Sequence, residues 1–284
     1  MQYIPIFVAS TGRSGSTLTM KILASHPQIL VRSLFPYETR TSQYYYICHL
    51  QGIEWVDFTP LKLGGIEYRP FQGNDKESSL WSQKQEQKKL EEYGINLTEE
   101  YYHFVAEQEH KPQAKSFAEK LVGLPLVKQM IDSLKDYKII FLQRDPRDTF
   151  FSIKSFNKKR GYFSFGEEQG DRTMFSNLIG FYKQYQQLQK SLNQENYINL
   201  KYEDILTEKM ATISKLFQSL NVDYSDRQVL DTIKYAFAES PESSQHQTSS
   251  SIQGSLFRWK QEADDRTLKM FASFHDELQQ IGYK

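Results

Sequence analysis

The chain has 284 residues, which is enough for one sizeable α/β domain with insertions or for two small domains. Its 35 basic and 35 acidic side chains give a net charge of zero, so the charge balance does not indicate a nucleic-acid partner or a membrane surface. The single cysteine, Cys48, excludes an intramolecular disulfide framework, and with no long apolar run and no signal-peptide pattern we expect a cytoplasmic protein without a membrane anchor.

The N-terminal part of the chain predicts a strand, a glycine-rich turn and a helix. Residues 4–9 form a short apolar run that is typical of a buried strand, and residues 16–25 have helical composition. A second strand is expected at 29–31. A tyrosine-rich segment at 38–50 is expected to be helical.

Residues 52–112 interrupt the alternation of strands and helices, and we interpret them as an insertion over the site. The stretch 52–78 has the glycine, proline and aspartate content of a loop. A strongly polar segment at 80–92 predicts an exposed helix. A further helix is expected at 98–109, with Thr98 as its N-cap.

From residue 114 onward, strands and helices alternate regularly. The expected strands are 114–119, 138–142 and 197–201. The expected helices are 124–134, one that starts at Pro146, 172–192, 208–220, 226–237 and a terminal helix at 257–281, after a serine-rich loop at 241–255. Strands separated by helices indicate a parallel sheet covered on both faces, so we predict one three-layer α/β/α domain over residues 1–284.

A candidate anion site lies at residues 11–17, between the first strand and the first helix. Backbone N–H groups and the helix dipole converge on an anion at such a junction. Two glycines let the backbone approach a phosphate, Arg13 adds a positive charge, and Ser16 and Thr17 add hydroxyl donors. The loop is not a Walker A motif, because its basic residue precedes the second glycine. An ordinary strand-to-helix turn is the alternative.

This loop resembles the 5′-phosphosulfate loop of the sulfotransferase superfamily, in which a basic residue is followed by Ser-Gly-Thr/Ser-Thr. The resemblance implies an α/β fold related to nucleotide kinases, of P-loop-kinase type, that uses 3′-phosphoadenosine-5′-phosphosulfate (PAPS) and needs no metal. It also implies that the donor is bound by a run of five residues. These are Arg13, Ser14, Gly15, Ser16 and Thr17.

A second candidate anion site follows the strand at 138–142. Arg144 lies at the mouth of the helix that starts at Pro146, and Ser152 follows eight residues later. The arrangement resembles the 3′-phosphate signature of the same family, and a charge-assisted pair with a hydroxyl donor is what recognition of that phosphate requires. A solvated basic helix end is the alternative, and we keep it for Lys158, Lys159 and Arg160.

Two further motifs extend the resemblance towards the C-terminus. Tyr202 belongs to a Tyr-Glu-Asp that resembles the strand end where the family's tyrosine approaches the adenine, with core packing as the alternative. Glu203 and Asp204 are expected to cap the following helix. Arg258, in Phe-Arg-Trp-Lys, resembles a basic residue that reaches the 3′-phosphate in tyrosine and bacterial enzymes, with one of the serines at 249–251 as a hydroxyl partner.

The transfer of a sulfuryl group needs a general base for the acceptor hydroxyl. Glu38, in Glu-Thr-Arg, resembles the base of tyrosine sulfotransferases, with a helix-start glutamate as the alternative. The histidines at 26, 49, 103 and 110 are rival bases. Lys120 matches a Glu-Lys at a strand end in bacterial and tyrosine enzymes, and we expect it to stabilise charge together with Arg13, unless it is a surface lysine.

We therefore expect a metal-independent PAPS-dependent sulfotransferase with a small-molecule or carbohydrate acceptor. A carbohydrate, a glycolipid or another metabolite hydroxyl is favoured. Aromatic side chains of the insertion could stack on it, namely Trp55, Phe58, Tyr68, Tyr101, Tyr102 and Phe104. An ATP-dependent phosphotransferase of the related fold and a non-catalytic homologue that binds adenosine 3′,5′-bisphosphate (PAP) are the two alternatives. The oligomeric state is left open.

Overall fold

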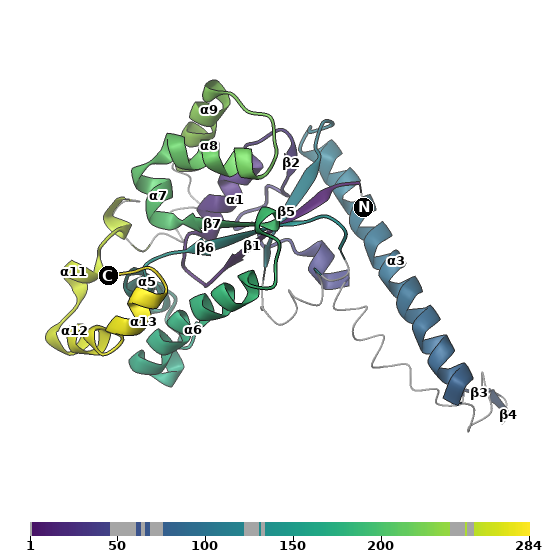
Figure 1. Ribbon diagram of the computed structural model, residues 1–284, viewed down its shortest axis with the longest axis horizontal. Coiled ribbons are helices and arrows are strands. Elements are labelled where there is room, and N and C mark those ends of the chain that lie inside the picture. Colours follow the sequence, from purple (N-terminus) through teal and green to yellow (C-terminus); the bar gives the residue numbers. More distant parts are fainter. Residues whose placement is uncertain are drawn as a thin grey trace.

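A parallel sheet of five strands forms the centre of the computed structural model (Figure 1). The structure describes residues 2–45, 61–63, 66–68, 76–121, 131, 134–238, 248 and 253–284. The strand order is β2-β5-β1-β6-β7, and every pairing between neighbours is parallel. The strands are β1 (Ile4–Ser10), β2 (Ile29–Leu30), β5 (Ser116–Leu121), β6 (Lys138–Gln143) and β7 (Tyr197–Lys201).

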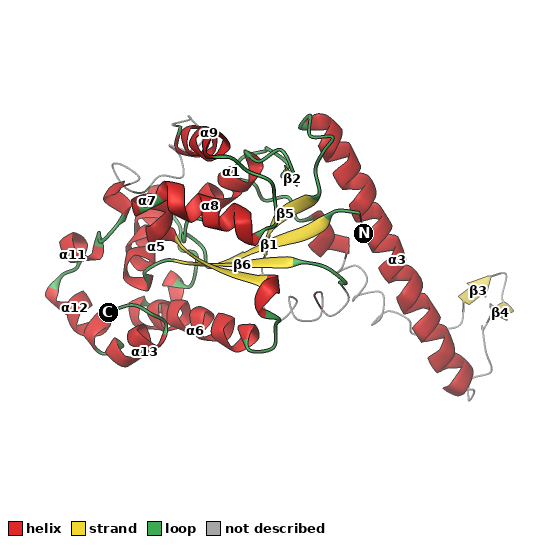
Figure 2. Ribbon diagram, turned by 45° about the horizontal axis from the view of Figure 1, so that its top comes forward, coloured by secondary structure: helices red, strands yellow, loops and turns green. Residues whose placement is uncertain are grey.

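Helices cover both faces of this sheet, so the predicted α/β/α fold class is confirmed (Figure 2). One face packs against α1 (Ser16–Ala24), α7 (Tyr202–Thr207), α8 (Lys209–Ser219) and α9 (Asp226–Phe237). The other face packs against α5 (Pro146–Arg160), α6 (Asp171–Gln189), α12 (Asp265–Ala272) and α13 (His275–Gln280). Short 3-10 turns lie at Glu167–Gln169, Gln194–Asn196 and Gln253–Ser255.

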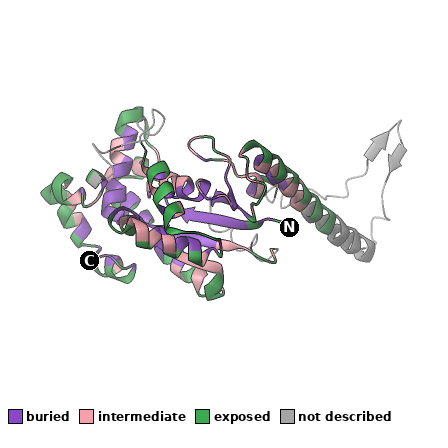
Figure 3. Ribbon diagram, turned by 90° about the horizontal axis from the view of Figure 1, so that it is seen from above, coloured by how far each residue is buried: buried purple, intermediate pink, exposed green. Residues whose placement is uncertain are grey.

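Strand β1 shows why the central strands are apolar throughout. Ile6 and Val8 belong to the core on the α1 side, whereas Phe7 and Ala9 belong to the core on the α6 side. Successive side chains of a strand point to opposite faces, and both faces are buried here (Figure 3). A continuous apolar run is therefore required, as the sequence predicted.

Helix α3 (Lys76–Gln108) is a single helix of 33 residues, so the prediction of two helices with Thr98 as an N-cap is wrong. The hydroxyl of Thr98 donates to the carbonyl of Gly94 at 2.8 Å inside the continuous helix. The helix reaches the sheet with its C-terminal part, where the ring of Tyr102 stacks on Phe117 of β5 at a centroid distance of 3.9 Å. Tyr102 is therefore a core residue, and the expectation that it stacks on an acceptor is wrong. The rest of α3 extends beyond the sheet edge (Figure 1).

The stretch 52–78 is also more regular than predicted. It contains an antiparallel pair, β3 (Leu61–Leu63) and β4 (Ile66–Tyr68), as well as the start of α3. The helix expected from residue 38 begins at residue 41 in the described part of the chain. The insertion spanning 52–112 stays an interpretation, because residues 51–60 and 69–75 lie outside the described part.

The terminal helix predicted at 257–281 is three helices, α11 (Trp259–Glu262), α12 and α13. The break after α11 has a clear local cause, because the side chain of Asp264 accepts a hydrogen bond from the backbone N–H of Thr267 and so starts a new helix. Several predictions fall outside the described residues. These are the ones on Cys48, His49, Trp55 and Phe58, on most of the helix at 124–134, and on the serines at 249–251.

Candidate functional site

The carboxyl ends of four neighbouring strands form one edge of the sheet. In the strand register, Ser10 of β1 lies beside Leu142 of β6, and Gln143 of β6 lies beside Lys201 of β7. Ligands of open α/β sheets bind outside this edge. The residues that follow each strand, among them the predicted site residues, are therefore brought together although they are far apart in sequence.

The loop after β1 has the backbone geometry of an anion site. Arg13 and Gly15 adopt left-handed conformations, with φ of 66° and 99°. The hydroxyl of Ser14 donates to the carbonyl of Thr11 at 2.7 Å and so closes the loop. Among the described residues, no side chain caps the first turn of α1 and that turn holds no acidic residue. Its N–H groups therefore remain oriented towards an anion.

Two aromatic rings pack directly on the glycines of this loop. A Cβ atom on Gly15 would come within 2.2 Å of the Tyr202 ring, and one on Gly12 within 2.3 Å of the Phe165 ring. Glycine is thus required at both positions by the close approach of a ring. Tyr202 also donates to or accepts from the hydroxyl of Ser255 at 2.9 Å. Phe165, which the sequence did not single out, borders the loop as well.

Arg144 connects the loop after β1 to the C-terminal segment. One of its terminal nitrogens donates to the carbonyl of Arg13 at 2.8 Å, and the other donates to the carbonyl of Ser255 at 2.7 Å. Its guanidinium carbon lies 4.7 Å from the centre of the Tyr202 ring. Its Nε is buried without a hydrogen-bond partner, and this leaves one donor of a fixed cation available to a ligand.

Ser152 and Arg258 are brought together through a residue that the sequence analysis missed. The hydroxyls of Ser152 and Thr248 lie 3.1 Å apart, and a terminal nitrogen of Arg258 donates to the same Thr248 hydroxyl at 3.3 Å. The sequence predicted a partner of Arg258 among the serines at 249–251, which begin one residue after Thr248. Hydroxyl residues fill this loop, so the sequence carries no signal that selects Thr248 among them.

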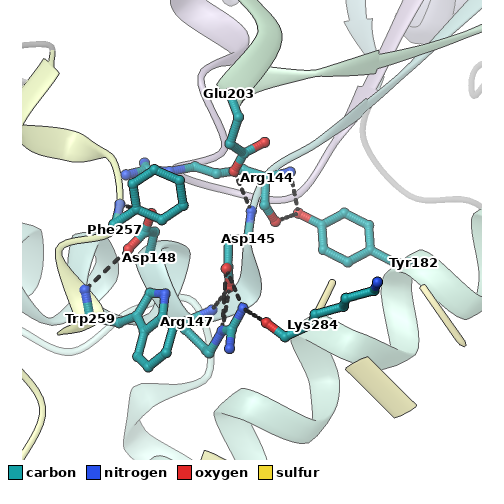
Figure 4. A network of polar contacts seen from close by, with 9 residues as sticks. All are labelled: Arg144, Asp145, Arg147, Asp148, Tyr182, Glu203, Phe257, Trp259 and Lys284. Carbon is teal, nitrogen blue, oxygen red and sulfur yellow. Dashed lines mark hydrogen bonds and ion pairs between the residues drawn. The ribbon is translucent and has the colours of Figure 1, made fainter. Parts of the chain in front are cut away.

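Asp148 is a second residue that was missed. Its carboxylate accepts a hydrogen bond from the N–H of Phe257 at 2.8 Å and from the N–H of Trp259 at 3.2 Å, so it holds the backbone on both sides of Arg258 (Figure 4). Burial raises the pKa of Asp148, and the two backbone donors and Arg144 oppose that shift. The sequence signal that could have identified Asp148 is its position as the last residue of Arg-Asp-Pro-Arg-Asp.

Arg147 lies in the same signature but is not directed at the loop. It forms a bidentate ion pair with Asp145, in which the shortest contact is 2.7 Å, and it stacks on the Trp259 ring at 4.1 Å (Figure 4). Its remaining terminal contact is with the carbonyl of Lys284 at 2.8 Å. Arg147 is therefore buried and paired, and it is not part of a solvated basic helix end.

Glu203 was expected to cap the helix that follows β7, but α7 already begins at Tyr202 and the Glu203 side chain has another partner. Its carboxylate accepts a hydrogen bond from the N–H of Asp145 at 2.7 Å and so ties the end of β7 to the loop after β6 (Figure 4). Burial raises the pKa of Glu203, and the bond from Asp145 opposes the shift. The described N-terminus of α7 has no side-chain cap.

Lys120 of β5 and Glu38 form the remaining part of the site. Lys120 is only 5% exposed, which excludes the surface alternative, and its Nζ donates to Glu38 Oε1 at 2.7 Å, to the Pro36 carbonyl at 2.6 Å and to Thr17 Oγ1 at 3.2 Å. Glu38 also pairs with Arg40. Burial, with the nearby charges of Arg40 and Arg13, lowers the pKa of Lys120 to about 7.

Two of the histidines that compete with Glu38, His26 and His103, lie elsewhere in the fold, whereas His49 falls outside the described residues. His26 follows α1 and precedes β2, at the opposite edge of the sheet, where its ring is buried and bonded to the backbone of Asp223 and Gln28. His103 of α3 bonds to the hydroxyl of Tyr3 at 3.0 Å. Glu38 is the candidate that contacts the residues of the loop edge.

The site is strongly cationic although the whole chain is neutral. Burial lowers the pKa of Arg13 to about 10, and the charges of Arg144, Arg258 and Arg160 contribute to the shift. The guanidinium of Arg13 also lies 4.2 Å from the centre of the Phe156 ring. Such repulsion between buried cations is relieved by a bound anion. Arg13 and Arg144 lie at the loop, and Arg258 lies beside Ser152 through Thr248, so a ligand with two anionic groups fits.

The described part of the chain lacks two classes of feature. No cluster of three or more histidine, cysteine, aspartate or glutamate side chains there could hold a metal ion. Within the same residues, no helix has both the length and the apolar character needed to cross a membrane.

Comparisons with known proteins point in one direction. A family model described as "Sulfotransferase family" matches residues 5–226. No curated protein matches the chain. Among solved structures, the sulfotransferase domain from the curacin biosynthetic pathway has 16% sequence identity and a TM-score of 0.57, and the match covers 100% of this chain and 99% of that one.

Two other solved structures show the same similarity. The sulfotransferase domain from the Synechococcus PCC 7002 olefin synthase has 18% identity and a TM-score of 0.50, with 96% of this chain and 95% of that chain covered. A retinol dehydratase in complex with retinol and PAP has 17% identity and a TM-score of 0.52, with 100% and 84% covered. At such identities the similarity concerns the fold.

Proposed function

Because the chain belongs to the sulfotransferase family, we propose that it transfers a sulfuryl group from PAPS to a hydroxyl group of an acceptor. The observation that carries the proposal is the pair of cationic groups at one sheet edge. Arg13 lies in the loop before α1, and Arg258 adjoins Ser152 on α5. A donor with a 5′-phosphosulfate and a 3′-phosphate presents two anionic groups to such a site.

The described residues at this sheet edge fit the donor. The loop of residues 12–17 would hold the 5′-phosphosulfate through backbone N–H groups and the Arg13 side chain. Arg144 keeps a buried, unpartnered Nε, and Ser152 with Arg258 would hold the 3′-phosphate. When bound, the donor supplies the sulfuryl group and a bisphosphate leaving group.

Glu38 is the proposed general base and Lys120 its partner. Contact with Lys120 favours the ionised carboxylate, which is the form that accepts a proton from the acceptor hydroxyl. Lys120 and Arg13 would stabilise the negative charge that increases at the reacting oxygens during transfer. The Thr17 hydroxyl, 3.2 Å from Lys120, joins this group to the first turn of α1.

The acceptor is proposed only as a small molecule or a carbohydrate hydroxyl. Retinol dehydratase structures that resemble this chain contain retinol or androsterone, which are small molecules. Phe165, an exposed aromatic side chain beside the loop, would provide a stacking surface for an acceptor. A screen of candidate hydroxyl compounds with donor labelled in its sulfuryl group would identify the acceptor. The cytoplasmic location and the single domain also stay predictions.

Calorimetry tests the donor assignment against the two alternatives. We expect PAP to bind in the absence of metal and ATP with magnesium not to bind, because the loop lacks a Walker-type lysine. The reverse preference would favour a phosphotransferase. Binding of PAP with no transfer of labelled sulfuryl group to any acceptor would favour the non-catalytic homologue.

A further inference from the structure

The side chain of Arg258 is oriented by an acidic residue of its own helix. Its Nε donates to Glu262 Oε1 at 2.7 Å, and a terminal nitrogen donates to Glu262 Oε2 at 2.9 Å. This fork-to-fork geometry is the most directional contact that a guanidinium makes. Arg258 is 4% exposed, whereas the side chain of Glu262 is 40% exposed, so the carboxylate reaches in from the surface.

Glu262 contacts Nε and one terminal nitrogen of Arg258, and the other terminal nitrogen contacts Thr248. Glu262 and Ser155 line a surface pocket of about 520 Å³ between α5 and the segment at 161–167, and Ser152 is not part of that lining. The nitrogen that bonds to Glu262 also donates to Ser155 at 2.8 Å, whereas the other terminal nitrogen faces Thr248. The carboxylate therefore occupies one edge of the guanidinium and leaves the opposite end for a ligand.

The backbone of Arg258 is fixed separately. Asp148 accepts hydrogen bonds from the N–H groups on both sides of it, and these bonds do not involve Glu262 (Figure 4). The loss of Glu262 would therefore release only the side chain of Arg258, which has many rotamers when it is not held.

We propose that Glu262 is a positioning residue that makes the site selective for nucleotides with a 3′-phosphate. It holds the guanidinium so that its free end is directed at the hydroxyls of Ser152 and Thr248, and the phosphate binds without a prior ordering of the arginine. The inference rests on the proposed function, because it assigns the 3′-phosphate to Arg258. The affinity for a ligand without a 3′-phosphate should therefore not depend on Glu262.

The test compares PAP with adenosine 5′-monophosphate by calorimetry on three forms of the full chain: wild type, Glu262→Ala and Glu168→Gln. Glu168 is an exposed acidic residue of the same region and serves as the control for a lost negative charge. We expect Glu262→Ala to weaken PAP about tenfold and to change the affinity for the monophosphate by less than about threefold. Glu168→Gln should leave both affinities unchanged.

The sign of the change separates positioning from simple charge effects. Tighter binding of PAP to Glu262→Ala would overturn the inference, because it would mean that Glu262 only neutralises Arg258. Equal weakening of both nucleotides would also overturn it, because that is the result of a general structural defect. In an Arg258→Ala background, Glu262→Ala should have no further effect on PAP, and an independent effect there would count against the proposal.

If Glu262→Ala does not fold, a second variant, Glu262→Gln, tests the same proposal. Glu262→Gln keeps one oxygen for the Arg258 Nε, so we expect a smaller loss of PAP affinity, again without a change for the monophosphate. An unchanged ratio of the two affinities in this variant would overturn the inference. If wild-type protein does not bind PAP, the proposed function fails as well, whereas tight wild-type binding with an unchanged ratio rejects only the role of Glu262.

Discussion

Nζ of Lys120 lies 2.7 Å from Oε1 of Glu38, although Lys120 is buried on β5 and Glu38 is 43% exposed. The contact places a cation with a lowered pKa beside a carboxylate at the edge of the sheet where the loop after β1 begins α1. The two residues were selected from separate motifs, and the fold brings them together. Their different environments give them separable roles, which can be tested independently.

Glu38→Gln should lower the rate of transfer by about 10²–10⁴-fold, because an amide cannot accept the proton of the acceptor hydroxyl. The affinity for PAP should change by less than about threefold, because the amide oxygen still accepts a bond from Lys120. Steady-state transfer rates and calorimetry measure the two effects. Glu107→Gln, an exposed position on α3, is the control. Full activity of Glu38→Gln would place the base elsewhere without affecting the family assignment.

The affinity for PAP should fall as the pH rises above 7. The pKa of Lys120 is lowered to about 7 by burial and by Arg40 and Arg13, so the ammonium form that attracts the 5′-phosphate is lost above that pH. One titrating group limits the change to about tenfold per pH unit. Calorimetry between pH 6.5 and 8.5, in buffers of different ionisation enthalpy, should show proton uptake on binding.

Lys120→Met provides the control for this pH dependence. The variant keeps the apolar stem and lacks the titrating group, so the affinity for PAP should be weaker at pH 6.5 and nearly constant above pH 7. A slope equal to that of the wild type would assign the titration to another group.

Gly15→Ala should destabilise the chain more than Gly161→Ala. Both glycines have positive φ, 99° and 78°, and alanine costs about 1–2 kcal/mol in that conformation. A Cβ on Gly161 meets no atom within 4 Å, whereas on Gly15 it meets the Tyr202 ring at 2.2 Å. The collision adds about 1–3 kcal/mol. Urea denaturation measures both, and equal losses would show that Tyr202 moves aside freely.

Arg147→Met should affect stability rather than recognition of the donor. Its ion pair with Asp145 has side chains only 9% and 7% exposed, and the loss of one partner of a buried pair costs about 3–5 kcal/mol. Lys154→Met is the matched control, because its pair with Asp171 is 37% and 46% exposed and should contribute less than about 1 kcal/mol. The affinity of the folded Arg147→Met protein for PAP should equal that of the wild type; a large loss would make Arg147 a ligand.

The elements that the sequence predicted best are those with a strong local signal. The apolar runs of β1 and β6 and the glycine-rich turn before α1 all lie where they were expected. Helix α3 was predicted as two helices, at 80–92 and 98–109, and the segment between them contains Gly94. One glycine inside a helix costs only about 1 kcal/mol, and a long helix tolerates it. Threonine is a common N-cap residue, but the hydroxyl of Thr98 donates to the carbonyl of Gly94 within the helix.

The same distinction applies to the site. Arg13, Arg144 and Tyr202 each follow a strand of a parallel sheet, so their convergence could be predicted from topology alone. Asp148 acts on backbone N–H groups more than a hundred residues away, a relationship that no spacing rule encodes. Lys120 had an unclear role in the sequence because its burial depends on the packing of the segment around Pro36.

Helix α3 has a structural consequence for the site. At 33 residues it is about 50 Å long, and only its C-terminal part contacts the sheet. There, Tyr102 donates to Glu119 at 2.8 Å, and the next residue of β5 is Lys120. The C-terminal end of the helix is therefore joined to the strand that carries Lys120 by a buried hydrogen bond. A substitution at Tyr102 would act on the site through Glu119, the residue that precedes Lys120 in β5.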